Sequence, residues 1–300
     1  MSDMHVRFVA LTSAAAVCVS LAITSPAQPQ ANRPSRPQPS CPQQPTQFHP
    51  CALEKAKTFT PPRTVDGKPD LQGFWRGQPA ATENVEAHPK TDDDDGGPTL
   101  IVDPMDGRIP YQPWAQQQVG DNRALYVEPN AACFPSGVPR SMYVPTQIEI
   151  RQNAFAVVIL FERAHTSRII RTDGRAHLDS RIKLWQGDSR GRWEGNTLVV
   201  DVTNQNGRAW LDQAGHFYTE AAHMVERLTL IDADTIHYQV TIDDPNVFTR
   251  PWTMAFPLRR NRQPGFALLE EACHEGERST DRLLRLGYKI YPGINRPPSR

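Results

Sequence analysis

Alternating apolar and polar positions dominate the second half of the chain. Between residues 235 and 242 every even position is apolar and every odd position is polar, which puts Ile236, Tyr238, Val240 and Ile242 on one face. A period of two is typical of a half-buried antiparallel strand. Similar segments recur from residue 146 to 271. We therefore expect an all-β fold, an antiparallel meander closed or nearly closed into a barrel of about eight to ten strands, with long Pro/Gly-rich loops and little helix.

Turn-forming residues between these segments predict how the strands pair. The expected turns are Gln152-Asn153, Asp173-Gly174, Gly195-Asn196 and the loop 232–234, and Asp-Gly is a strong signal because tight hairpin turns need residues with positive φ. The corresponding pairs are Ile150–Phe155, Ile148–Val157, Ile170–His177, Arg168–Asp179, Trp193–Leu198, Leu230–Ile236 and Leu228–Tyr238. The last register places Glu226 opposite Val240 on an apolar face, whereas His237 falls on the polar face and is expected to contact solvent.

Composition divides the chain into three parts. Arg7 precedes an apolar run over 8–23 and small residues at 25–27, which is the pattern of a secretory signal peptide over 1–27. An uncleaved anchor is the alternative, although the run is shorter than the ~20 apolar residues of a membrane span. Residues 28–62 are rich in Pro and Gln and are expected to form a disordered linker. A single β-barrel domain should occupy 63–300, with a short helix near 279–286.

Charge and cysteine usage restrict the partners and the compartment. Lys plus Arg and Asp plus Glu both number 33, and this balance argues against nucleic acid, because phosphate binding needs a concentrated basic face. No segment after the signal is apolar enough to cross a bilayer. An even number of cysteines in an exported chain favours disulfides, and we expect Cys41–Cys51 and Cys133–Cys273, with free thiols as the alternative. This usage suits a periplasmic or secreted protein.

An ionisable side chain on an apolar face is the strongest candidate for chemistry. Glu226 occupies such a position, and there a carboxylate must be paired or have a shifted pKa. With His177 or His223 it would suit general acid/base catalysis, while Arg168 or Arg175 would hold an anionic group of a ligand. The simpler alternative is an internal ion pair between Glu226 and an arginine, which would only order the barrel.

Other motifs carry less weight. Residues 187–191 match G-x-S-x-G, but a hairpin rather than a helix follows Ser189, so the context of a nucleophile is missing. No HExxH or CxxC spacing supports a metal site, and we expect neither a metal nor another cofactor. His165 joins the ligand-binding candidates instead. So do four tryptophans, whose rings would be either core or the walls of a pocket: Trp185, Trp193, Trp210 and Trp252.

Two resemblances to known groups follow from particular segments. Gly73-x-Trp75, ahead of an antiparallel meander, resembles the G-x-W motif of lipocalin-like (calycin) barrels. That resemblance implies a tryptophan that plugs one end of the barrel against a late-strand arginine, here Arg259 or Arg260. The segments DGKPDLQGFW, RWEGNTLVVD and VERLTLIDADTIHYQVTIDDP resemble those of a large group of uncharacterised exported bacterial proteins. This second resemblance implies export and one β domain, and no particular substrate.

Together these observations predict an exported barrel that binds a small, partly apolar molecule. The loops around 103–144 and 204–222 would cover its mouth, as long ordered loops often cover functional sites. An enzyme on the same scaffold, a lyase, isomerase or hydrolase, is the first alternative. A structural protein of the envelope, with the Pro-rich arm as its contact, is the second.

Overall fold

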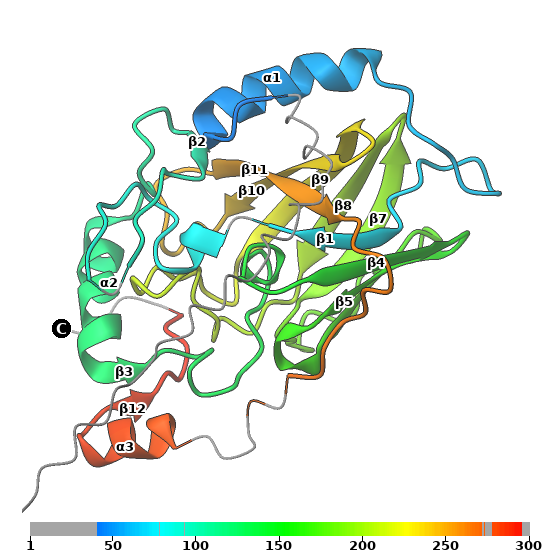
Figure 1. Cartoon of the computed structure of the whole chain (residues 1–300). Helices are drawn as coiled ribbons and strands as arrows, with labels where there is room; N and C mark the ends of the chain where they lie inside the picture. The colour runs from blue at the N-terminus through cyan, green and yellow to red at the C-terminus, as the bar shows by residue number, and fades with distance from the viewer. Residues whose placement is uncertain (1–40, 78, 93, 272, 274–277, 296–300) are drawn as a thin grey trace, which may run out of the picture. The chain divides into compact units, whose positions relative to one another are not determined.

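The alternating segments form strands that close into a ring (Figure 1). The computed structural model describes residues 41–295 except 78, 93, 272 and 274–277. The expected signal peptide, 1–27, and the beginning of the expected linker lie outside the described residues. Among the helices that the structure describes, none has the length and apolar character of a membrane span.

The described elements have the following bounds. The strands are β1 (Gly73–Arg76), β2 (Ile101–Asp103), β3 (Tyr126–Val127), β4 (Ile148–Asn153), β5 (Ala156–Phe161), β6 (Ser167–Arg171), β7 (Asp188–Glu194), β8 (Thr197–Thr203), β9 (His223–Asp232), β10 (Thr235–Asp243), β11 (Trp252–Asn261) and β12 (Lys289–Ile290). The α-helices are α1 (Pro45–Thr58), α2 (Pro113–Leu125) and α3 (Ser279–Arg285), and 3-10 turns lie at 79–82, 140–142 and 163–165. The last α-helix falls where the sequence predicted one.

The main sheet is a closed barrel. Its ten strands follow the order β1-β4-β5-β6-β7-β8-β9-β10-β11-β2, and β1 also pairs with β11, which closes the nine strands other than β2 into a ring. Neighbouring strands in the ring are antiparallel except β6 and β7. Closure removes the exposed strand edges that promote association. The expected fold class, a mostly antiparallel barrel with little helix, is confirmed.

The Gly-x-Trp motif lies where β1 closes the ring. Trp75 is completely buried, and the guanidinium carbon of Arg260 lies 4.0 Å from the centre of its ring. Arg260 also donates to the carbonyl of Gln72 at 2.6 Å. A Cβ atom at Gly73, whose φ is +124°, would lie 2.5 Å from a nitrogen of Arg260, so glycine leaves the space that this arginine occupies. Of the two arginines suggested by the motif, Arg260 therefore contacts the tryptophan.

Three of the four predicted hairpins form, and two of them have the predicted turn and register. Trp193 pairs with Leu198, and Leu230 pairs with Ile236, which places Glu226 opposite Val240 as expected. The β4–β5 register was wrong, because the turn lies at 154–155 and Ile150 pairs with Ile159. The Asn153 side chain explains the shift, since its Oδ1 accepts hydrogen bonds from the backbone N–H groups of residues 155 and 156, both at 2.9 Å.

The predicted Asp173-Gly174 hairpin does not form. β6 runs parallel to β7, and Ile170 pairs with Ser189 instead of His177. Residues 172–187 return along the outside of the barrel, where the backbone N–H of Leu178 donates to Asp188 at 3.0 Å. The turn signal at Gly174, with φ +76°, is real, but side-chain contacts of the returning loop replace a strand pairing that local sequence alone favours.

The two ends of the barrel differ in their connections. Short turns at 154–155, 195–196 and 233–234 join strands at one end. The long segments 77–100, 104–147, 204–222 and 244–251 all meet strands at the other, which we call the loop-rich end. The unpredicted helix α2 lies within one of these segments. The expected coverage of one end by long loops is therefore present.

Helix α1 packs against the outer wall of the barrel, over β9 and β11 (Figure 1). Its Phe48 and Ala52 are fully buried with Ile231, and the Cys41–Cys51 disulfide lies beside them. The structure therefore places an ordered helix within residues that composition predicted to be disordered. His237 is 3 % exposed under this helix rather than in solvent, with its Nε2 3.0 Å from Nδ1 of His49.

Apolar side chains fill the interior of the ring. Side chains that point inward from neighbouring strands have exposed fractions of 0–1 %, among them Ile159, Val200, Val240, Met254 and Phe256. Such values leave no room for a water molecule beside these groups, as in a close-packed core. At the level of these residues the barrel is a core and not an open lumen.

Acid should weaken the contact between α1 and the barrel. Burial, together with the nearby His49 and Arg227, lowers the pKa of His237 from 6.5 to about 3. Between these two pH values the unfolded chain binds more protons than the folded protein. The contribution of neutral His237 to stability is therefore fully present above pH 6.5 and falls as the pH drops below it. We expect His237→Gln to reduce the difference in urea midpoint between pH 7.5 and pH 4.5.

The exposed His165 supplies the control for this experiment. Its side chain is 45 % exposed, so His165→Gln should keep the pH dependence of the wild type. An equal pH dependence in His237→Gln and the wild type would show that the buried histidine contributes nothing to acid sensitivity.

Candidate functional site

A charged cluster lies inside the apolar ring. Arg168 on β6 pairs through both terminal nitrogens with the Glu226 carboxylate on β9, and Nη1 to Oε1 measures 2.9 Å. The hydroxyl of Tyr238 donates to the same carboxylate at 2.6 Å, and Nε of Arg168 donates to Ser189 Oγ at 2.8 Å. All four side chains are at most 3 % exposed. The expected proximity of Glu226 and Arg168 is therefore present in the structure.

The cluster satisfies its own hydrogen bonds and charges. Burial alone would lower the pKa of Arg168, but the carboxylate of Glu226 outweighs this effect and raises it. Burial and the same carboxylate raise the pKa of Tyr238 well above its usual value, so its hydroxyl remains a donor. Every nitrogen of the guanidinium has a partner. This geometry matches an internal ion pair that orders the barrel.

His177 and His223 meet on the opposite, outer face of the sheet. Nε2 of His177 lies 2.8 Å and Nε2 of His223 lies 2.9 Å from the two oxygens of Asp201. Nδ1 of His177 is 2.8 Å from Asp188. Burial alone would raise the pKa of Asp201, but hydrogen bonds from both histidines outweigh burial and hold it below its usual range. The wall of the barrel thus separates these histidines from Glu226.

The outer cluster is a hydrogen-bonded network that holds the 172–187 loop against the barrel. Exposed fractions of 28 % for His177 and 45 % for His223 leave it in contact with solvent. Within the described residues, no three or more His, Cys, Asp or Glu side chains are arranged to hold a metal ion. Asp188 and Asp201, which complete the network, were not anticipated: Asp188 occupies a variable position of the G-x-S-x-G match, and Asp201 stands in no recognisable motif.

Several other predicted site residues lie apart from both clusters. Arg175 is 68 % exposed and pairs with Asp173, whereas Arg168 is buried. His165 lies in an exposed turn. Trp193 packs against the core beside the 195–196 turn. Trp252 is completely buried and contacts Phe248.

The chain segments that carry Trp185 and Trp210 meet at the loop-rich end, although no contact joins the two rings in the described part of the chain. Three segments meet there around Gly137: a Cβ atom at this position would lie 2.8 Å from Ala209 Cβ, 2.8 Å from Tyr218 Oη and 3.0 Å from the carbonyl of Trp185. Trp185 stacks on Phe134 with ring centres 5.1 Å apart. Only glycine, here with φ +70°, permits this approach. The loop 128–142 is therefore fixed against both tryptophan-bearing segments.

Buried donors without partners occur in each of the segments that carry Gly137, Trp185 and Trp210. Nε and Nη2 of Arg140, Nε2 of Gln186 and Nε1 of Trp210 are buried and have no hydrogen-bond partner in the described part of the chain. Most buried polar groups in proteins are paired, and unpaired ones call for a specific explanation. These atoms are donors, so an oxygen acceptor would complement them; the 128–142 loop also holds one buried acceptor without a partner among the described residues, Oδ1 of Asn130. We call Arg140, Gln186 and Trp210 the donor cluster.

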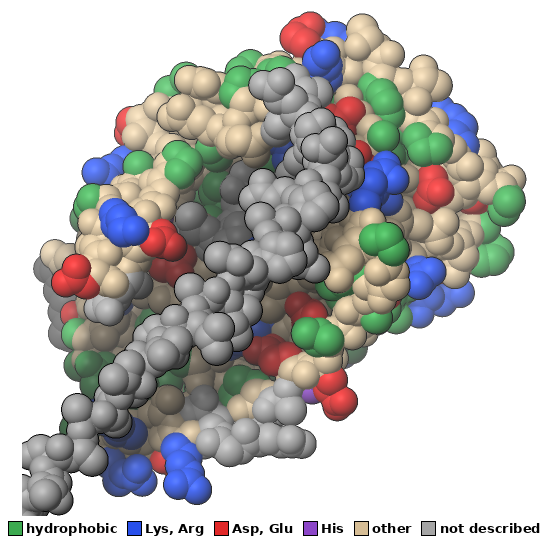
Figure 2. Space-filling view, in the orientation of Figure 1, with side chains coloured by type: hydrophobic (Ala, Val, Ile, Leu, Met, Phe, Trp, Pro, Cys, Tyr) green, Lys and Arg blue, Asp and Glu red, His purple; other side chains and the backbone are tan. Residues whose placement is uncertain are grey.

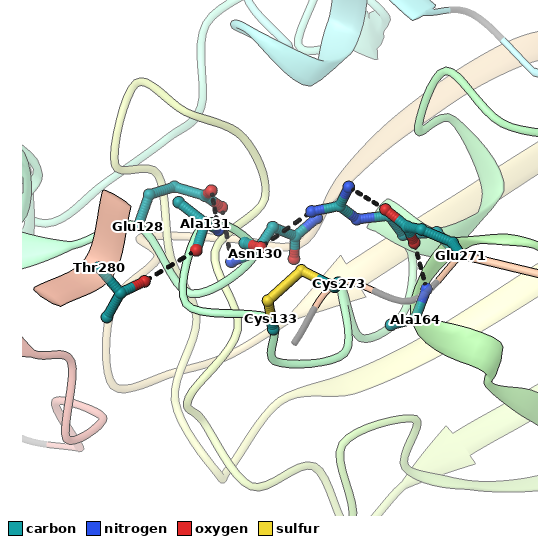
Figure 3. The surroundings of a disulfide bond; sticks show 9 residues. Glu128, Asn130, Ala131, Cys133, Ala164, Glu271, Cys273 and Thr280 are labelled. Atoms are coloured by element: carbon teal, nitrogen blue, oxygen red, sulfur yellow. Dashed lines mark hydrogen bonds and ion pairs between the residues drawn. A yellow bond between two sulfur atoms is a disulfide. The ribbon is translucent and has the colours of Figure 1, made fainter. Parts of the chain in front are cut away.

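Figure 3 shows how the loop that carries Arg140 is anchored. The disulfide Cys133–Cys273 ties it to the C-terminal segment, as the sequence predicted. Thr280 donates to the carbonyl of Ala131 at 3.0 Å, and Arg163 donates to that of Asn130 at 2.9 Å. Contacts from distant parts of the chain thus set the position of the donor cluster. Sequence reasoning missed Arg140 because its segment shows no periodicity.

Comparisons with known proteins identify no family for this chain, so its function must be inferred from the geometry described above. No protein-family model matches the chain, and no match to a curated protein is found. Among solved structures, the chain is similar to a mutant of the REP1-NXSQ fatty acid transporter, with 11 % identity and a TM-score of 0.24 over 39 % of this chain and 72 % of that one. Similarity at this level identifies no ligand. The strand pairing establishes the class of protein, a closed and mostly antiparallel β-barrel.

Removal of the inner carboxylate tests the role of the buried ion pair. We expect Glu226→Gln to lower the free energy of unfolding by about 3–5 kcal/mol, because Arg168 then stays buried without a charged partner. Urea denaturation measures this change. Tyr238→Phe is the matched control, since it removes one neutral donor to the same carboxylate and should cost about 1 kcal/mol. Wild-type stability in Glu226→Gln would contradict an ordering role.

Proposed function

We propose that this protein is an exported binding protein that takes up a small, partly apolar molecule at the loop-rich end of its barrel. The observation that carries this proposal is the donor cluster, whose buried nitrogens on Arg140, Gln186 and Trp210 have no acceptors among the described residues. Ser141, next to Arg140, holds the amide of Gln186 close to this arginine. Ligand sites are mostly apolar surfaces with a few oriented polar groups. The rings of Trp185 and Phe134 supply the apolar surface beside these donors.

The packed ring supports this location for the ligand. Inward-pointing side chains leave no accessible surface between the strands, so the interior takes no guest without unpacking. The guanidinium of Arg140 is itself 1 % exposed. Binding therefore requires the 128–142 loop to shift relative to Trp185 and Tyr218, while the Cys133–Cys273 disulfide limits how far it moves.

Two features support export and a small-molecule partner. The protein has two disulfides, and such bonds persist in oxidising compartments outside the cytosol. This agrees with the pattern of a secretory signal peptide in the sequence. Figure 2 shows Lys and Arg side chains interspersed with Asp and Glu over the described part of one face. A mixed surface of this kind gives nucleic acid no basic track to follow.

The enzymatic alternative draws less support from the geometry. Glu226 is completely buried and shared by Arg168 and Tyr238, so it lacks access to a substrate. His177 and His223 lie on the outer wall and cannot act together with it. The residues chosen for acid/base chemistry thus form two separate clusters, and each has its own partners.

Native mass spectrometry of the exported protein tests the proposed function. Purified without detergent, the wild type should carry a non-covalent adduct that is released on denaturation. Trp210→Phe removes one donor of the cluster and should lower the bound fraction, whereas Trp193→Phe, beside the opposite end, should leave it unchanged. A protein that carries no adduct, or equal loss in both variants, would contradict binding at the loop-rich end.

A further inference from the structure

Two arginines are buried in the described part of the chain, and they differ in how many guanidinium nitrogens have hydrogen-bond partners. Arg168 engages all of its nitrogens, two with Glu226 and Nε with Ser189. Arg140 pairs only Nη1, with Glu128, and leaves Nε and Nη2 without a partner. These two nitrogens lie on one edge of the planar group, and their N–H bonds are parallel. Arg140 thus has an edge of two parallel donors that is buried in the protein and has no hydrogen-bond partner within the described residues.

A two-donor edge of this kind matches a planar group with two acceptor oxygens. The N–H pair of a guanidinium and the two oxygens of a carboxylate have the same spacing, so the pair forms two charge-assisted hydrogen bonds at once. The free amide nitrogen of Gln186 adds a third donor, and Ser141, next to Arg140 in the chain, fixes the orientation of that amide by donating to its oxygen at 3.1 Å.

Glu128 does not use up the charge of Arg140. Its carboxylate also accepts hydrogen bonds from the backbone N–H groups of Asn130, at 3.1 Å, and Ala131, at 2.8 Å. Its side chain is 18 % exposed, in contrast to 1 % for Arg140. Solvent and two backbone dipoles therefore stabilise the negative charge of Glu128. The positive charge of Arg140 is buried, and Glu128 alone does not neutralise it, so a second anion would be attracted to the unpaired nitrogens.

The neighbouring tyrosine favours the same ligand. Burial raises the pKa of Tyr218, although the charge of Arg140 opposes this rise, so the phenol stays protonated. Its hydroxyl is 3.5 Å from Oε1 of Gln205, which is a long contact. The protonated phenol therefore adds a donor group to those of Arg140 and Gln186, while the unpaired acceptor in the same loop is Oδ1 of Asn130.

We propose that Arg140 anchors a carboxylate group of the ligand, so that the bound molecule is an apolar carboxylic acid. This inference rests on the proposed function and specifies its ligand. The apolar part of the acid would lie along the stacked rings of Trp185 and Phe134. The carboxylate would accept from Nε and Nη2 of Arg140 once the 128–142 loop has shifted.

The molecules released from the purified wild-type protein provide the probe. They are treated with a methylating reagent for acids and analysed by tandem mass spectrometry. We expect each released molecule to gain one methyl group and, before methylation, to lose carbon dioxide on fragmentation. A released molecule without an acid group, or one with a phosphate or sulfate ester, would overturn the carboxylate assignment and leave the proposed function intact.

A variant that keeps the charge tests the geometry of the edge. Arg140→Lys preserves the pairing with Glu128 but lacks two parallel donors, and we expect about a tenfold or greater loss of ligand affinity. Arg151→Lys, which alters an arginine that is 65 % exposed, should retain full binding. Thermal unfolding of both variants confirms that each is folded. Full occupancy in a folded Arg140→Lys protein would overturn the assignment, and release of nothing from the wild type would overturn the proposed function itself.

Discussion

Closure of the sheet by β1 is the constraint on which the rest of the structure depends. This strand spans only Gly73–Arg76, yet it pairs with both β4 and β11. Burial of Trp75 beneath Arg260 holds it there. A closed ring has no free edge and encloses its interior completely. Every polar group that points inward must therefore find its partners among the other inward-pointing side chains.

The ion pair between Arg168 and Glu226 is one response to that requirement. Buried charges are costly unless they are paired and hydrogen-bonded, and Tyr238 and Ser189 complete the arrangement. At the loop-rich end the same kind of side chain has a different environment. Arg140 is equally buried, but two of its three guanidinium nitrogens have no acceptor in the described part of the chain. This contrast between a satisfied and an unsatisfied arginine is the reason for proposing a ligand site at Arg140 and not at Arg168.

The covering segments differ in what fixes them. Helix α1 relies on apolar contacts of Phe48 and on a neutral histidine pair. The loop around Arg140 relies on a disulfide, on hydrogen bonds to backbone carbonyls and on the close approach at Gly137 (Figure 3). Protonation of His237 should weaken the first arrangement, whereas the second holds its loop through bonds to distant parts of the chain.

Local sequence determined the strands, two of the hairpin registers and the inward position of Glu226, because alternation and turn residues act over a few positions. The disulfides were expected from the even number of cysteines in an exported chain, although the second bond joins residues 140 positions apart. The parallel β6–β7 pair, the helix over 45–58 and the burial of His237 were decided by contacts between distant segments. The same holds for the donor cluster. Residues 128–142 have no period that predicts where their side chains point, and only the approach of the segments at 185, 209 and 218 places Arg140 inside the protein.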